Sequence, residues 1–304
     1  MATLREIRRR ISGVKSTEKI TKAMKMVAAA KLRRAQGALL SARPYSRKLG
    51  ELMSHLAGGS ELDEHPLVIE RPVKGVAIIV VAADRGFCGA FNTNIMKATL
   101  QHIEKNYSNL NNLGRVTLFA VGKKASDYFS KRNFNVAGNY SGIFHELTFA
   151  TAKRLVSDVL KGYTDGTYDR VDVVYNEFKS IIQQHLVVDR FLPIPKEALN
   201  GDKPKQKRGN YVRHVELQYI YEPGMGLILE KLIPRHLEFQ VWRMLLESNA
   251  AGEGARMAAM DSASQNASEL ISSLSLEYNN ARQTAITKEL LEVVSGAEAL
   301  NSAR

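Results

Sequence analysis

Apolar residues recur at alternating steps of three and four near both ends of this 304-residue chain. Near the start, the pattern runs through Leu4, Ile7, Ile11 and Val14. Near the end, the same steps connect a second series that is rich in alanine: Met260, Ala263, Ala267, Leu270 and Leu274. Such spacing places apolar side chains along one face of an α-helix, and a second helix must cover that face. The sequence therefore predicts two long helices that pack against a helical partner.

The helix at the start of the chain has recognisable boundaries. Thr3 and Glu6 form a T-x-x-E capping box, in which the hydroxyl and the carboxylate each satisfy a free backbone amide. Gly58 and Gly59 are expected to end the helix. Pro44 lies inside the pattern and removes one amide donor, so a kink or an interruption is expected there.

The apolar face of this helix is predicted to change register. After the first four members the next apolar member is Ile20, and a local change of winding is expected at Gly13 and Ser16. The series then continues through Met24 and Val27. Near the other end of the chain, the helical face is expected to continue beyond Leu274 through Glu277 and Ala281. After a second change of register, it is expected to continue through Ile286, Leu290 and Val293.

The two helices are too long for one compact core. A helix of ~55 residues is ~80 Å long and one of ~70 residues is ~105 Å long, at ~1.5 Å per residue. We therefore expect the helices to pair with each other, antiparallel, outside a central domain. The predicted division is a coiled-coil helix over 1–59, an α/β domain over 73–221, and a second coiled-coil helix over 222–304 that pairs with 1–59.

The central part of the chain alternates between strand and helix patterns, which is typical of an α/β domain. Five short runs rich in β-branched residues are predicted as strands, over 75–83, 115–122, 170–178, 185–192 and 215–221. Amphipathic helices are predicted over 92–105, 123–132 and 147–162. The segment 201–210 has four basic residues and no aliphatic or aromatic one, so we expect a solvated loop.

The positive charge of the chain is concentrated at its start. The net charge is +12, and residues 1–50 carry 14 basic and 2 acidic side chains. Such a segment contacts nucleic acid, anionic lipid or an acidic protein surface, or it is simply a solvated face. A coiled-coil protein that binds nucleic acid through residues 5–34 is therefore one hypothesis, although no aromatic residue precedes Tyr45.

No pattern of catalytic or metal-binding residues stands out. The seven histidines are scattered, and the single cysteine, Cys88, excludes an intramolecular disulfide. The loop DRGFCGAFN (84–92) lacks the G-x-G-x-x-G spacing of a dinucleotide site, so Gly86 and Gly89 are expected to shape a tight turn. We predict no catalytic residue, cofactor or metal, and keep a Rossmann-type enzyme using residues 75–122 as an alternative.

A membrane span is not expected. The longest apolar run, Val76 to Ala83, is 8 residues, whereas a spanning helix needs ~20. The opening residues lack the continuous apolar region of a signal peptide, and Glu6 and Glu18 argue against a transit peptide, which is poor in acidic residues.

Four segments resemble one known family. Residues 4–36 (LREIRRRISGVKSTEKITKAMKMVAAAKLRRAQ) and 84–92 (DRGFCGAFN) are similar to the amino-terminal and central motifs of the ATP synthase gamma subunit. Residues 253–271 and 278–300 are similar to its carboxy-terminal signature. The resemblance implies an α/β fold class in which the terminal helices form a long antiparallel coiled coil beside a Rossmann-like domain that holds no nucleotide.

The resemblance also implies a role and partners. A gamma chain is the non-catalytic rotor shaft of the proton-translocating ATP synthase: it turns within a ring of alpha and beta subunits and regulates ATPase activity. Its globular end, with the epsilon subunit, meets the c-ring of the membrane sector, and no nucleic acid is involved. The motif starts at residue 4 and the cysteine-bearing insertion of the chloroplast form is missing, so we expect a bacterial, peripheral protein on the cytoplasmic face of the inner membrane.

The resemblance assigns site residues as well. The positions that match contacts with the beta subunit are Met24, Lys25, Arg256, Arg282, Gln283 and Thr287. Met24 has the alternative of plain packing in the apolar seam. The central loop contributes Arg85, Gly86, Cys88 and Gly89. A smooth apolar tip, where the shaft turns, is expected from Leu290, Leu291, Val293, Val294 and Ala299–Leu300.

Overall fold

The computed structural model describes residues 3–56, 65–180, 184–195, 222 and 224–302. The chain divides into two compact units, which are described one at a time. The larger unit is Ala29–Arg256, and the smaller unit combines Met1–Ala28 with Met257–Arg304. The predicted strand over 215–221, the basic loop over 201–210 and the helix-ending Gly58 and Gly59 lie outside the described residues.

The larger unit contains a five-stranded sheet with the order β3-β2-β1-β4-β5. The strands are β1 (Val76–Val81), β2 (Val116–Val121), β3 (Asn135–Tyr140), β4 (Arg170–Phe178) and β5 (Gln184–Leu192). The first four strands are parallel, and β5 is antiparallel to β4. In β1 and β2 every residue is buried, because helices cover both faces of a parallel sheet.

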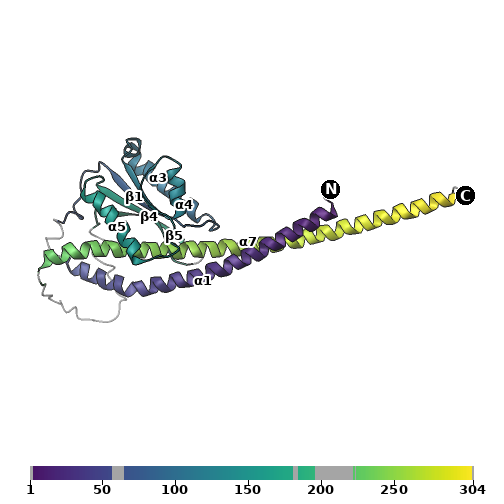
Figure 1. The fold of residues 1–304 in the computed structure, drawn as a ribbon, viewed down its shortest axis with the longest axis horizontal. Coiled ribbons are helices and arrows are strands. Elements are labelled where there is room, and N and C mark those ends of the chain that lie inside the picture. Colours follow the sequence, from purple (N-terminus) through teal and green to yellow (C-terminus); the bar gives the residue numbers. More distant parts are fainter. Residues whose placement is uncertain (1–2, 57–64, 181–183, 196–221, 223, 303–304) are drawn as a thin grey trace, which may run out of the picture. The chain divides into compact units, whose positions relative to one another are not determined.

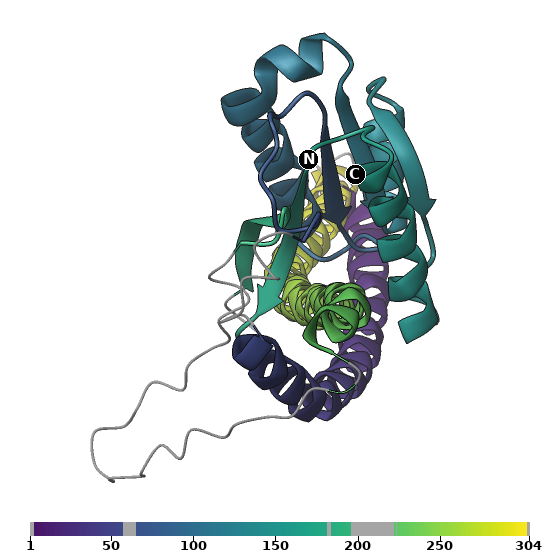
Figure 2. The same ribbon diagram turned by 90° about the vertical axis from the view of Figure 1, so that its left-hand side faces the viewer.

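Helices α3 (Phe91–Asn112), α4 (Lys123–Ser130) and α5 (Phe149–Thr164) connect the parallel strands. Alternate residues of β1 enter two different cores. Val76, Ile78 and Val80 pack with residues of α3 and α4, whereas Ala77 and Ile79 pack with residues of α5. Accordingly, α3 and α5 lie on opposite sides of the sheet (Figure 2).

Four of the strand predictions are confirmed within one or two residues at each end, and β3 was missed. Its sequence, NVAGNY, contains two asparagines and a glycine, and only Tyr140 is buried, so it lacks the apolar run that marked β1 and β2. Gly138 suits this strand because a Cβ there would lie 2.8 Å from the ring of Phe119.

The two terminal helices, α1 (Leu4–Leu56) and α7 (Met225–Ser302), run antiparallel within each unit (Figure 1). In the larger unit the rings of Tyr45 and Phe239 lie 4.7 Å apart. In the smaller unit Lys25 Nζ lies 2.5 Å from Asp261 Oδ1. In the same unit Ser264 Oγ lies 2.7 Å from Thr21 Oγ1, so residue numbers rise along one helix as they fall along the other, which confirms the expected pairing. The three-part division into 1–59, 73–221 and 222–304 stays a prediction.

The seam of α1 does not change register, so that prediction was wrong. Every member of an unbroken heptad series is buried or half-buried: Leu4, Ile7, Ile11, Val14, Glu18, Thr21, Lys25, Ala28, Leu32, Ala35, Leu39, Ala42, Ser46, Leu49, Met53 and Leu56. The series passes through polar residues, which an apolar pattern overlooks. Ile20 and Val27, expected in the seam, are instead 59% and 56% exposed.

The seam of α7 in the smaller unit needs the same correction. It follows Met260, Ser264, Ala267, Ile271, Leu274, Tyr278, Ala281 and Ala285. Leu270 and Glu277, which were expected in the seam, are exposed. From Ile286 to Ala297 every side chain is exposed, because the paired seam ends at Ala285.

The expected interruption at Pro44 was also wrong, because α1 is one helix from Leu4 to Leu56. Pro44 and Leu40 are both exposed. The carbonyl of Leu40 loses its amide donor to the proline, but it lies on the face where water can replace that donor. Helix α7 likewise continues through Pro234.

Candidate functional site

The central loop, Asp84–Ala90, joins the end of β1 to α3 and begins with a carboxylate that binds backbone amides. Asp84 Oδ1 accepts hydrogen bonds from the amides of Lys123 and Gly142, both at 2.8 Å. Asp84 Oδ2 accepts one from the amide of Phe144 at 2.9 Å. One side chain therefore fixes the loop to the first residue of α4 and to the segment after β3.

The same carboxylate lies at the edge of the sheet where α/β domains bind their ligands. Ligands of such sheets bind at the carboxyl ends of the strands, with phosphate at a helix N-terminus. Here Asp84 follows β1 and occupies the amide of Lys123 at the start of α4. The negative charge that this helix N-terminus favours is supplied by the chain itself.

Asn92 closes the other end of the central loop. Its Oδ1 accepts the amide of Ala83 at 3.0 Å, and its Nδ2 donates to the carbonyl of Arg85 at 3.4 Å and to Cys88 Sγ at 3.1 Å. Cys88 is 3% exposed, and burial raises the pKa of its thiol. A buried thiol with a raised pKa is a poor nucleophile at neutral pH.

Arg256 of α7 reaches the middle of the same loop. Its Nε donates to the carbonyl of Gly86 at 3.2 Å, and its Nη2 donates to the carbonyl of Arg85 at 3.3 Å. Its Nη1 forms an ion pair with Glu253 at 2.7 Å. The residue is 9% exposed, so its guanidinium is committed within the larger unit.

The turn of the loop is made by two residues with positive φ. Gly89 has φ +57°, which fits the expectation of a tight turn. The second residue is Phe87, with φ +60°, and not Gly86. Phe87 is 73% exposed. No sequence pattern indicated that a phenylalanine would be held in this conformation, which L residues rarely adopt.

A hollow of about 340 Å³ lies beside the central loop, within the larger unit. Its lining includes Asp84 and Arg256, with three further cationic residues: Lys31, Arg85 and Lys123. In the part of the chain that the structure describes, the charged groups of these three make no ion pair. The surface around the loop is therefore cationic.

The residues expected to contact the beta subunit are not brought together. Met24 is half-buried at the edge of the α1 seam, and Lys25 is paired with Asp261. On α7, Arg282, Gln283 and Thr287 are exposed in the smaller unit, whereas Arg256 belongs to the larger one.

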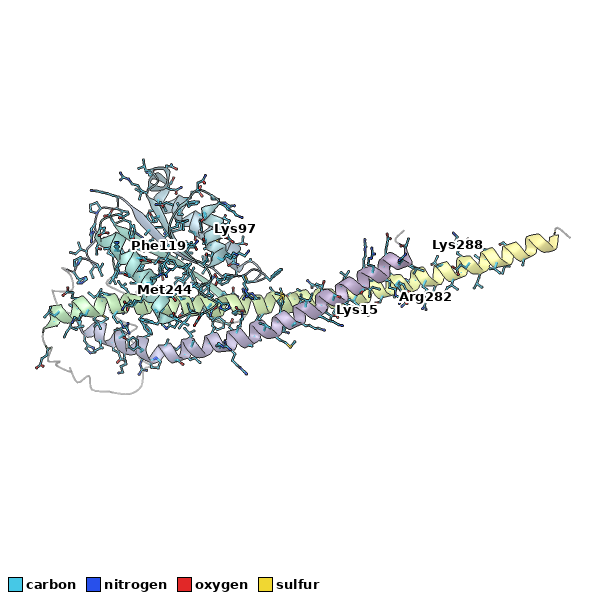
Figure 3. The ribbon with its side chains drawn as sticks, in the orientation of Figure 1. Lys15, Lys97, Phe119, Met244, Arg282 and Lys288 are labelled. Carbon is cyan, nitrogen blue, oxygen red and sulfur yellow. The ribbon has the colours of Figure 1, made fainter. Side chains whose placement is uncertain are left out.

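The exposed end of α7 offers both charge and apolar surface. The side chains of Arg282 and Lys288 project from the helix (Figure 3). Five apolar residues beyond the paired region are exposed: Ile286, Leu290, Leu291, Val293 and Val294. Ala299 and Leu300 belong to helix α7, and their side chains lie outside the description.

A buried polar network in the larger unit was not predicted from the sequence. Asp172 of β4 is buried and accepts hydrogen bonds from His102 Nε2 at 2.7 Å, Tyr107 OH at 2.5 Å and Arg170 Nε at 3.0 Å. Burial alone would raise the pKa of Asp172, but these hydrogen bonds and the charge of Arg170 hold it below the usual value. The network joins α3 to β4.

The structure offers no metal centre and no membrane span among the residues it describes. No group of three or more His, Cys, Asp and Glu side chains in that part of the chain is placed to hold a metal ion. None of the helices described combines the length and the apolar character that crossing a membrane requires.

Comparison with known proteins gives a consistent result. The family model described as ATP synthase matches residues 3–300. A relative from Chloroherpeton thalassium named ATP synthase gamma chain is 50% identical over 302 residues, which cover 99% of each chain. A relative of the same name from Salinibacter ruber is 45% identical over 304 residues, again with 99% of each chain covered.

Solved structures share the fold. A chain in the Euglena gracilis mitochondrial ATP synthase (OSCP/F1/c-ring) matches with a TM-score of 0.65 at 22% identity, over 99% of this chain and 95% of that one. A chain in the Tetrahymena thermophila mitochondrial ATP synthase (central stalk/c-ring) matches with a TM-score of 0.58 at 24% identity, over 81% of this chain and 99% of that one. From its family match and its full-length relatives, this chain belongs to the ATP synthase gamma-chain family.

Proposed function

We propose that this chain is the rotor shaft of a rotary ATP synthase, transmitting rotation of a membrane c-ring to a catalytic ring of alpha and beta subunits. The observation that carries the proposal is the antiparallel pairing of α1 and α7 along an unbroken heptad seam, in a chain of the gamma family. Small seam residues, such as Ala28, Ala35 and Ala267, favour close approach of the two helices.

Energetics explain why a shaft is needed. One charge that crosses 100 mV releases only ~2.3 kcal/mol. The free energy of several crossings must therefore be combined for each ATP, and a stiff helix pair can carry it from the membrane to distant catalytic sites. An asymmetric shaft would bias three otherwise identical catalytic subunits toward different conformations through differential contact.

The partners follow from the same proposal. The alpha and beta subunits surround the helix pair, and the epsilon subunit and the c-ring meet the α/β domain. The structures that share the fold both carry the c-ring in their descriptions, with the central stalk in one and F1 in the other, which supports this assignment. The chain would be peripheral, on the cytoplasmic face of a bacterial cell membrane, and proton or other ion transport would occur in other subunits.

Direct contacts with the beta subunits are proposed for Met24, Lys25, Arg282, Gln283 and Thr287, and for Arg256 a contact through the central loop that its guanidinium holds. Arg282, Gln283 and Thr287 are exposed beyond or at the end of the paired region, and so is the apolar surface from Ile286 to Val294. The basic face of α1 would meet acidic loops of the beta subunits. Several weak polar contacts suit a turning shaft, because one tight contact would stall it.

The chain is proposed to be non-catalytic by itself and to use no cofactor. Asp84 occupies the amide of Lys123 at the start of α4, and the one thiol is buried. These observations also count against the alternative of a Rossmann-type enzyme.

Reconstitution tests the proposal. The isolated chain should show no ATPase activity, and its addition to alpha and beta subunits should give a complex with stimulated ATPase activity. A tagged chain should also co-purify with alpha, beta and epsilon chains from a membrane-associated fraction. ATPase activity of the isolated chain, or no effect on the alpha and beta subunits, would contradict the proposal.

A further inference from the structure

The central loop is held by residues next to it in the sequence and by one residue from a distant part of the chain. Asp84 fixes its start to α4 and to the segment after β3, and Asn92 fixes its end to Ala83. Both are residues of the loop or of the helix that follows it. The middle of the loop is held by Arg256, which lies about 170 residues further along the chain, on α7.

We propose that Arg256 is a positioning residue that latches the central loop onto helix α7, and thereby fixes the side chains that the loop presents. The inference rests on the proposed function only in that the loop is presented to a partner subunit. The latch itself is a property of the isolated chain.

The geometry requires an arginine. The guanidinium binds two successive carbonyls, those of Arg85 and Gly86, through Nη2 and Nε, while Nη1 pairs with Glu253 one turn earlier on the same helix. A planar fork can make these three interactions at once, whereas a lysine ammonium is a single point of charge. Because Arg256 is only 9% exposed, water does not readily replace it.

The latch holds a strained and exposed structure. Phe87 follows the two latched carbonyls, has φ +60° and exposes 73% of its surface. Such a backbone conformation persists in a non-glycine residue only when its surroundings impose it. Arg256 thus supports the presentation of Phe87 and of the exposed Arg85. One turn earlier on α7, a Cβ added at Gly252 would lie 3.5 Å from the ring of Phe91, so the helix lies close to the start of α3.

Cys88 supplies a direct assay, because it is the only cysteine of the chain and its side chain is buried although it belongs to the loop. The rate at which a disulfide reagent such as DTNB labels the full chain reports how often the loop opens. Arg256→Gln should raise this rate about tenfold or more, because hydrogen bonds from a charged donor are lost. Arg256→Lys, which keeps the charge but not the fork, should give an intermediate rate.

Two controls separate the latch from a general loss of stability. Arg243→Lys changes an arginine on the same helix that pairs with Glu247 and should leave the labelling rate unchanged. Labelling through local opening of the loop should also stay constant over low urea concentrations, whereas labelling through global unfolding should rise with urea. Measurements over a range of pH separate thiol ionisation from accessibility.

Equal labelling rates for wild-type, Arg256→Lys and Arg256→Gln chains would overturn the latch, and so would increases that depend steeply on urea. If Arg256→Gln does not fold, Arg256→Lys still decides the question. Failure of the latch leaves the reconstitution experiment untouched. Conversely, a chain that does not assemble with alpha and beta subunits can still show faster labelling when Arg256 is changed.

Discussion

The hydroxyl of Ser264 donates a hydrogen bond to the hydroxyl of Thr21 across the α1–α7 seam, at 2.7 Å. Both residues are buried, and Thr21 donates in turn to the carbonyl of Glu18 at 3.0 Å. Ser264 Oγ also lies 2.8 Å from the carbonyl of Met260 on its own helix. The contact between the two hydroxyls forms only where the helices are aligned with Thr21 opposite Ser264, so it favours that register.

Thr21→Val and Ser264→Ala should each weaken the seam by about 1 kcal/mol, and the double variant should cost less than the sum of the two. The physical reason is that removing both hydroxyls leaves no buried group without its partner. Hydrogen exchange of α1 amides around residue 21 measures this local stability. Ser262→Ala, an exposed position on α7, is the control, and strictly additive effects would contradict a coupled pair.

This pair also explains what the sequence could and could not predict about the helices. Their existence, direction and approximate ends followed from periodic apolar residues. The register did not, because Glu18, Thr21 and Ser264 occupy seam positions that a search for apolar residues skips. Ile20 was chosen as a seam member because it is apolar, although the heptad places it on the exposed face.

Gly122→Ala should lower the free energy of unfolding by at least about 2 kcal/mol. Gly122 has φ +89°, and a Cβ there would lie 2.0 Å from the carbonyl oxygen of Ala82. Urea unfolding of the full chain measures the loss. Gly86→Ala is the matched control, because the nearest atom to its Cβ is Lys124 Cε at 3.9 Å. A Gly122→Ala chain as stable as Gly86→Ala would show that the strand ends are not packed as described.

Asp84→Asn should destabilise the chain by roughly 2–3 kcal/mol, although the change is nearly isosteric. The carboxylate accepts three backbone amides, and an asparagine side chain replaces one accepting oxygen with a donor that faces such an amide. Thermal unfolding compares this variant with Asp127→Asn, an exposed aspartate on α4. Equal melting temperatures for the two variants would argue that the three hydrogen bonds contribute little.

His236 should make stability depend on pH below about 6.5. Burial, with the nearby charge of Arg243, lowers the pKa of His236 to about 4. Between pH ~6.5 and ~4 the unfolded chain binds a proton that the folded chain does not, so stability is full above this window and falls as pH decreases through it. The shift corresponds to a loss on the order of 3 kcal/mol.

Comparison of wild-type with His236→Gln isolates this contribution from that of Glu247, whose pKa is raised by burial and which acts in the opposite direction. Unfolding free energies at a series of pH values should decline less steeply for the variant. His145→Gln, at an exposed position, should keep the wild-type slope. Parallel curves for all three chains would show that His236 is not protonated on unfolding.

The candidate site was only partly predictable. The loop 84–92 was recognised from its glycines and its motif, but the partners of its residues lie far along the chain. Asp84 binds amides about 40–60 residues away, and Arg256 reaches back about 170 residues. Contacts of this kind depend on how the sheet and α7 pack, which local spacing does not encode. For the same reason the network around Asp172 gave no signal in the sequence.

Rotation of the chain inside an assembled complex tests the central claim most directly. A chain with Cys88→Ala and Lys97→Cys carries one reactive thiol on the exposed surface of α3, where Lys97 lies (Figure 3). With the alpha and beta subunits fixed to a surface, a probe attached to this thiol should turn in one direction when ATP is added, and stop without it. A probe that stays still while the complex hydrolyses ATP at its full rate would contradict the assignment of this chain as the shaft.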